Sequence, residues 1–157
     1  MDSGETSTTS GSDGSFAIKY ENGALISLGG QDVDTLTQLD NFQIIRDLSG
    51  YSSDNFMITP VTSVAHFMPS QNIYNTLGLD SSININTADP VANKGDGAGY
   101  DLLYEKGNQL TVLAYSLQNM ANNLKTSTDS TADYFKAISE EINTEHMATS
   151  SAVNIEK

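Results

Sequence analysis

Side chains that carry oxygen gather in the stretch NTADPVANKGDGAGYD, residues 86–101. Asp89, Asn93, Asp96 and Asp101 could offer carboxylate and amide oxygens, and the glycines among them would let backbone carbonyls turn inward. Calcium takes about six to eight such oxygens. The spacing is not that of an EF-hand, however, and Asp and Gly are also ordinary loop residues. We therefore expect a surface connector that caps the following helix, with calcium held by these four residues as the alternative.

Two further readings concern aspartates. The Asp89–Pro90 bond is of an acid-labile type, and some secreted modules cleave themselves at Asp-Pro. The favoured interpretation is structural, with Asp89 as an N-cap and Pro90 at the first helical position. Asp32 and Asp34, beside a glycine pair, form a second and weaker calcium candidate.

Residues for acid–base or nucleophilic catalysis do not form a recognisable motif. His66 and His146 lie far apart in the chain, and neither HExxH nor GxSxG is present. The acids Glu140, Glu141 and Glu145 fit a solvated helix face better than general acid–base work. We therefore expect a protein that is not an enzyme.

Composition narrows the class of protein. The 157 residues include 7 Lys and Arg but 20 Asp and Glu, for a net charge of −13. Such a charge repels phosphate backbones, so nucleic acid is not an expected partner. No apolar run is long enough for a membrane helix. The absence of cysteine excludes disulfides and fits the cytoplasm as well as secreted proteins that rely on calcium.

The first part of the chain favours β-structure. Residues 1–14 are polar and predict a disordered linker or tail. Residues 16–28 alternate apolar and polar types around Asn22-Gly23, which predicts a β-hairpin with its turn there. Further strands are expected near 41–47 and 55–58.

The second part favours helices. Thr59 is a good N-cap with Pro60 at the first helical position, and Pro69 ends that helix. A second helix follows Ser70 and ends at Gly78. The last helix is expected to begin at Ser130, with Asp133 as its capping partner.

Between these lies a long amphipathic helix, from about residue 100 to residue 125. Its apolar stripe repeats at steps of three and four, and we expect it to face the core, with a short coiled-coil seam as the alternative. The stripe consists of Leu110, Leu113, Leu117, Met120 and Leu124.

Together these patterns predict one α+β domain over residues 15–147. Residues 15–58 form a short antiparallel β unit that includes the N-terminal hairpin, and residues 59–147 form a bundle of about four helices packed on it. Residues 148–157 are expected to be a frayed tail.

Four short motifs occur in a recognisable order: Gly29-Gly30-Gln31-Asp32 with Thr35, Ile58-Thr59-Pro60-Val61-Thr62-Ser63, Leu77-Gly78-Leu79, and Ala88-Asp89-Pro90-Val91-Ala92. In this order the chain resembles a module of very long secreted or cell-surface, adhesin-like proteins of marine bacteria. The resemblance covers roughly residues 15–95. The polar segment 71–75 and the long insert before Asp101 depart from the pattern. The resemblance implies no catalytic residues.

The expected role is that of a non-catalytic module of a bacterial surface or secreted protein, which serves adhesion, matrix contact or spacing. Its expected location is extracellular or at the cell surface. The expected partner is a protein or polysaccharide, and the module itself is expected to be a monomer. The alternative is a binding protein, such as a lipoprotein, that holds a small ligand or peptide between the β unit and the helices.

Overall fold

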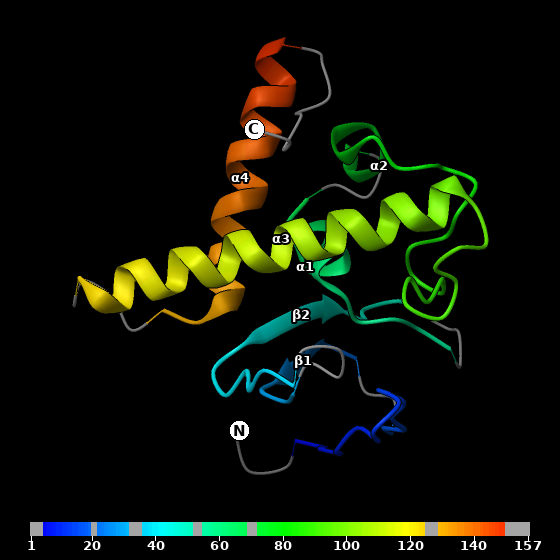
Figure 1. Cartoon of the computed structure of the whole chain (residues 1–157), viewed down its shortest axis with the longest axis vertical. Helices are drawn as coiled ribbons and strands as arrows, with labels where there is room; N and C mark the ends of the chain where they lie inside the picture. The colour runs from blue at the N-terminus through cyan, green and yellow to red at the C-terminus, as the bar shows by residue number, and fades with distance from the viewer. Residues whose placement is uncertain are drawn as a thin grey trace.

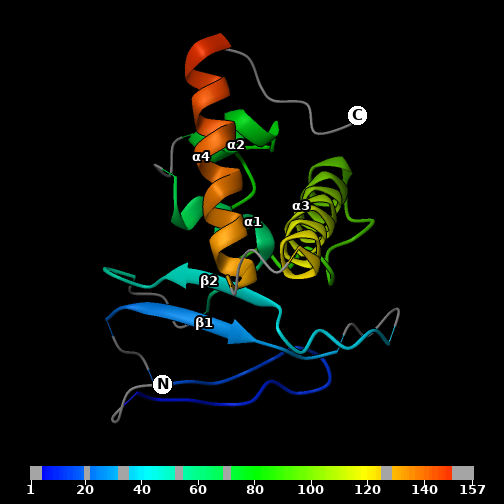
Figure 2. The same cartoon turned by 90° about the vertical axis from the view of Figure 1, so that its left-hand side faces the viewer.

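The computed structural model describes residues 5–19, 22–31, 36–51, 55–68, 72–124 and 129–149. Two antiparallel strands, β1 (Ala24–Leu28) and β2 (Gln43–Asp47), form a small sheet. Four helices follow: α1 (Pro60–His66), α2 (Asn72–Leu77), α3 (Ala98–Asn123) and α4 (Thr131–Thr149). The sheet lies at one end and α3 crosses α4 above it, with α1 between them (Figure 1, Figure 2). The predicted α+β class, with a small β unit packed on helices, is confirmed.

The β unit pairs differently from the predicted hairpin over 16–28. β1 is the expected second arm, but its partner is β2, in a register from Ala24 opposite Asp47 to Leu28 opposite Gln43. Residues 16–19 form no strand. Burial explains the choice, because Phe42 and Leu48 flank β2 and are buried in the domain, whereas Phe16 only packs edge-on against Phe56.

The strand predicted near 55–58 is absent from residues 55–58 of the structure. The backbone of Met57 is nevertheless satisfied. Its N–H donates to the carbonyl of Asn86 at 2.8 Å, and its carbonyl accepts from the guanidinium of Arg46. A loop and a side chain therefore take the place of a neighbouring strand.

The predicted helix boundaries between the sheet and α3 are largely confirmed. The hydroxyl of Thr59 accepts from the N–H of Thr62, and the hydroxyl of Thr62 accepts in return from the N–H of Thr59. At the end of α2, Gly78 adopts φ 67°, where a side chain would be strained, and Leu79 N–H returns to the carbonyl of Tyr74 at 2.8 Å. The residues expected to end α1 and begin α2, Pro69 and Ser70, lie outside the described residues.

The core lies where α1, α3 and α4 meet over β2. Phe42 of the β unit packs edge-on against Phe135 of α4, with ring centroids 6.0 Å apart, and against Tyr115 of α3 at 6.4 Å. Val64 of α1 and Leu110 of α3 are completely buried beside them. One cluster thus joins the β unit to the three helices.

The core-facing stripe predicted on α3 is confirmed at two of its five residues and wrong at the other three. Leu110 is buried and Leu117 packs against the core, but Leu113 is 36% exposed, Met120 60% and Leu124 70%. The face that is buried consists of Leu103, Lys106, Leu110, Ala114 and Gln118. α3 crosses the other helices rather than running along them, so its C-terminal end extends beyond the core (Figure 1).

Candidate functional site

The connector between α2 and α3 brings the four predicted calcium ligands into one hydrogen-bonded loop. Asp89 Oδ1 accepts the N–H groups of Val91 at 2.9 Å and Ala92 at 3.0 Å. This is the capping role expected for Asp89 before Pro90, although a turn follows rather than a helix. The carboxylate of Asp89 thus caps the backbone that follows Pro90, as the structural interpretation of the Asp-Pro step expected.

The other three predicted ligands also bond within the loop. Asn93 donates its side-chain N–H to Asp96 Oδ2 at 3.2 Å, and Asp101 Oδ1 accepts the N–H of Gly95 at 2.8 Å. Asp101 stands in the first turn of α3, so this bond ties the connector to the start of that helix. One carboxylate oxygen of each of Asp89, Asp96 and Asp101 therefore already accepts a hydrogen bond that stabilises the loop.

Within the described parts of the chain, no group of three or more His, Asp or Glu side chains is placed to hold a metal ion. Calcium at Asp89, Asn93, Asp96 and Asp101 therefore stays a prediction from the sequence. The second candidate, Asp32 and Asp34, lies outside the described residues.

The start of the connector is organised by a fourth carboxylate, that of Asp80. Hydrogen bonds from Ser82 hold the pKa of Asp80 below its ordinary value of 3.8. The bond from the backbone N–H has the larger effect, and the bond from the hydroxyl has the smaller one. Gly99 of α3 lies against Asp80 and Ile83 so closely that an added Cβ would stand 2.7 Å from Ile83 Cδ1. Asp80 thus stabilises the start of the connector through Ser82 and also packs against α3 at Gly99.

The space between the β unit and the helices is filled. Ser63 of α1 accepts the N–H of Ile45 at 3.0 Å and donates to the carbonyl of Thr59 at 3.0 Å. Thr131 of α4 bonds β2 in a similar way, and the rings of Phe42 and Phe135 occupy the middle. Side chains that could have contacted a ligand here are used to hold the elements together.

Arg46 is a residue that sequence reasoning missed. It is only 3% exposed, and its guanidinium donates to the carbonyls of Met57 and Asn86. The guanidinium also lies 4.5 Å from the ring centroid of Tyr51 and 5.4 Å from that of Phe56. An arginine within an isoleucine strand, followed by two aromatics, was the available signal. These contacts lie within the domain, so Arg46 joins β2 to the loop at Met57 and to the loop at Asn86.

The described histidine contacts do not build a catalytic pair. His66, at the end of α1, packs against the ring of Phe67 with centroids 4.6 Å apart. Its Nδ1 is buried and has no hydrogen-bond partner in the described part of the chain. His146 lies on α4, but its side chain is outside the described set.

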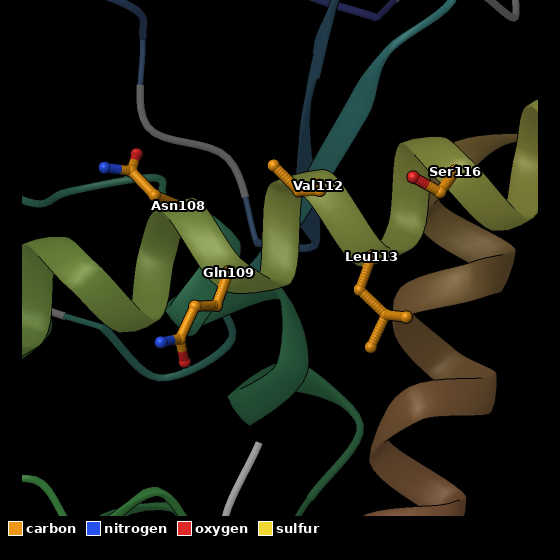
Figure 3. Close-up of a pocket in the computed structure, with 5 residues that line it drawn as sticks. All are labelled: Asn108, Gln109, Val112, Leu113 and Ser116. Atoms are coloured by element: carbon orange, nitrogen blue, oxygen red, sulfur yellow. The ribbon is translucent and has the colours of Figure 1, made fainter. Parts of the chain in front are cut away.

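A shallow hollow lies on the outward face of α3. It is lined by Asn108, Gln109, Val112, Leu113 and Ser116, all from this one helix. Asn108, Val112 and Ser116 project to one side of the helix and Gln109 and Leu113 to the other (Figure 3). The hollow is the groove between two rows of side chains spaced four residues apart.

Comparison with known proteins finds no match: no protein-family model, no curated protein and no solved structure is significantly similar to this chain. Among the described residues, no helix is long and apolar enough to span a membrane.

Proposed function

We propose that the chain is a non-catalytic module of a bacterial surface or secreted protein, serving adhesion, matrix contact or spacing. The observation that carries the proposal is the filled junction between the β unit and the helices. There the hydroxyls of Ser63 and Thr131 and the guanidinium of Arg46 all bond to backbone groups. These three polar side chains inside the domain are spent on stability, and the outer surface is where we expect contact with a partner.

Charge and motif order support the same proposal. A net charge of −13 keeps the domain soluble and disfavours polyanions as partners. The GG-x-D, ITPxTS and DPVA motifs resemble those of surface modules, and a protein or polysaccharide is the partner that such a module would contact. The alternative, a ligand site between the β unit and the helices, would need a hollow where Phe42 and Phe135 now pack.

The experiment is protease treatment of intact cells of the bacterium that encodes the protein, followed by immunodetection. We expect an antibody against the domain to detect it in the culture medium or on the surface of intact cells. Protease added to the intact cells should remove the surface signal. A cytoplasmic protein serves as the control for lysis. Detection only after lysis would refute a surface or secreted role. In a second arm, beads coated with the domain should retain extracellular matrix material more than beads coated with an unrelated acidic protein.

A further inference from the structure

From the outward face of α3 we infer that the domain pairs with a second copy of itself. The contact surface is the exposed row, defined as Val112, Ser116, Met120 and Leu124, which follow one another at steps of four. Val112 is 66% exposed, and Met120 and Leu124 are exposed to a similar extent. The row thus presents three exposed apolar side chains, interrupted only by the small Ser116, and an exposed apolar surface of this kind often marks a contact site.

The lack of charge along this surface argues for a second copy. No residue from Asn108 to Leu124 carries a charge, over a helix length of roughly 25 Å. Each copy carries −13, so two copies repel one another through most approaches. The exposed row lets them meet with uncharged surfaces while the carboxylates remain in water.

The order of side chains in the exposed row is self-complementary. Val112 and Met120 lie one helical turn on either side of the small residue Ser116. If a two-fold axis passes near Ser116, Val112 of each copy faces Met120 of the other, as an isologous contact requires. The small side chain at the centre lets the two helices approach, and the groove beside Leu113 can receive the row of the other copy (Figure 3).

The contact should be weak. One helix face is smaller than the roughly 800 Å² per partner of a standard interface. We therefore expect a dimer with a dissociation constant of roughly 0.1 mM rather than a permanent one. This pairing differs from the monomer expected from the sequence, and it gives a role to Met120 and Leu124, the two most exposed residues of the predicted stripe. It does not depend on the proposed surface role.

The test is sedimentation equilibrium of the whole chain over a wide concentration range. We expect the average mass to rise toward that of a dimer for the parent protein, and to stay at the monomer value for Met120→Asp. The matched control is Asn122→Asp, which adds the same charge to an exposed position of the same helix outside the row, and it should dimerise like the parent. Added salt should strengthen the dimer, because it screens the mutual repulsion.

A cross-linking arm locates the axis. The chain has no cysteine, so Ser116→Cys introduces a single thiol, and Ala137→Cys on α4 is the exposed control. We expect oxidation to join two copies through position 116 much faster than through position 137. A monomeric mass at every concentration would overturn the proposal and leave the face to another partner. Equal dimerisation of Met120→Asp, or equal cross-linking at both positions, would show that the row is not the contact.

Discussion

Thr131 Oγ1 lies 2.6 Å from the backbone nitrogen of Gln43, and the two residues are 88 positions apart in the chain. The same hydroxyl donates to the carbonyl of Asn41 at 3.1 Å. Thr131 is completely buried at the start of α4, and Gln43 begins β2. One side chain thus satisfies two backbone groups of the β unit and sets where α4 meets the sheet.

Thr131→Val should therefore destabilise the domain. The replacement keeps the shape but leaves the half-buried N–H of Gln43 without its acceptor, at a cost of about 1–3 kcal/mol. A fall in melting temperature of several degrees is expected for a domain of this size. Thr111→Val is the matched control, because the Thr111 hydroxyl donates to the carbonyl of Gly107 within its own helix. Equal losses in the two variants would contradict the role given to Thr131.

Leu110 and Leu113 should respond very differently to truncation. Leu110 is completely buried, so Leu110→Ala should cost about 2–5 kcal/mol in the free energy of unfolding. Leu113 is 36% exposed, and Leu113→Ala should cost clearly less. Urea denaturation of both variants measures the difference. If Leu113→Ala proved as costly as Leu110→Ala, the sequence-based core stripe would be right after all.

The same pair of leucines shows what the sequence could predict. Local signals predicted the structure correctly where one residue determines the backbone, as Thr59 does at the start of α1 and Gly78 at the end of α2. The repeat of apolar residues also predicted that α3 is a long helix. Which side of α3 faces inward depends on the angle at which it crosses α1 and α4, and Leu110, Leu113 and Leu117 alone do not encode that angle. The buried face includes Ala114 and Gln118, and neither residue type by itself indicates a core position.

The partner of β1 and the chemistry of the connector illustrate the same limit. Asn22-Gly23 is a valid turn signal, but long-range burial of Phe42 and Leu48 outweighs local pairing and selects β2. For the connector, composition predicted a loop and named Asp89 as a cap. Composition could not show that Asp89, Asp96 and Asp101 would each accept a neighbouring N–H, because that depends on how the loop turns.

Asp80 offers a prediction on pH. Hydrogen bonds from Ser82, first through its N–H and then through its hydroxyl, lower the pKa of Asp80 below 3.8. Ser82→Ala removes the hydroxyl and should raise that pKa partway back, whereas Ser81→Ala, the neighbouring control, should leave it unchanged. NMR titration of the Asp80 side-chain carboxyl carbon measures both. A parent pKa at or above 3.8 would contradict the geometry.

The sign of the linked stability follows from the lowered pKa. The ionised form of Asp80 is favoured in the folded state, so its contribution is complete above pH 3.8 and is lost as the pH falls through the folded-state pKa. The stability difference between the parent and Asp80→Ala should accordingly shrink below pH 3.8. A difference that grew on acidification would mean that the protonated carboxyl is the favoured form.

Calcium should leave the melting temperature unchanged. One oxygen of Asp89 and one of Asp101 already accept backbone N–H groups, and one of Asp96 accepts from Asn93, so calcium would compete with bonds that shape the connector. A net charge of −13 concentrates cations near the surface, but it does not assemble six or more converging oxygens.

The measurement is a thermal melt in millimolar calcium and in chelator at matched ionic strength. A ligand that binds only the folded state at a hundredfold excess over its Kd stabilises by about 2.7 kcal/mol, which is a shift of several degrees. Magnesium at the same concentration separates a specific site from general screening. A rise with calcium alone that disappears in Asp96→Asn would establish a calcium site in the connector. Equal melting in all three conditions would leave residues 86–101 as a loop held by its own hydrogen bonds.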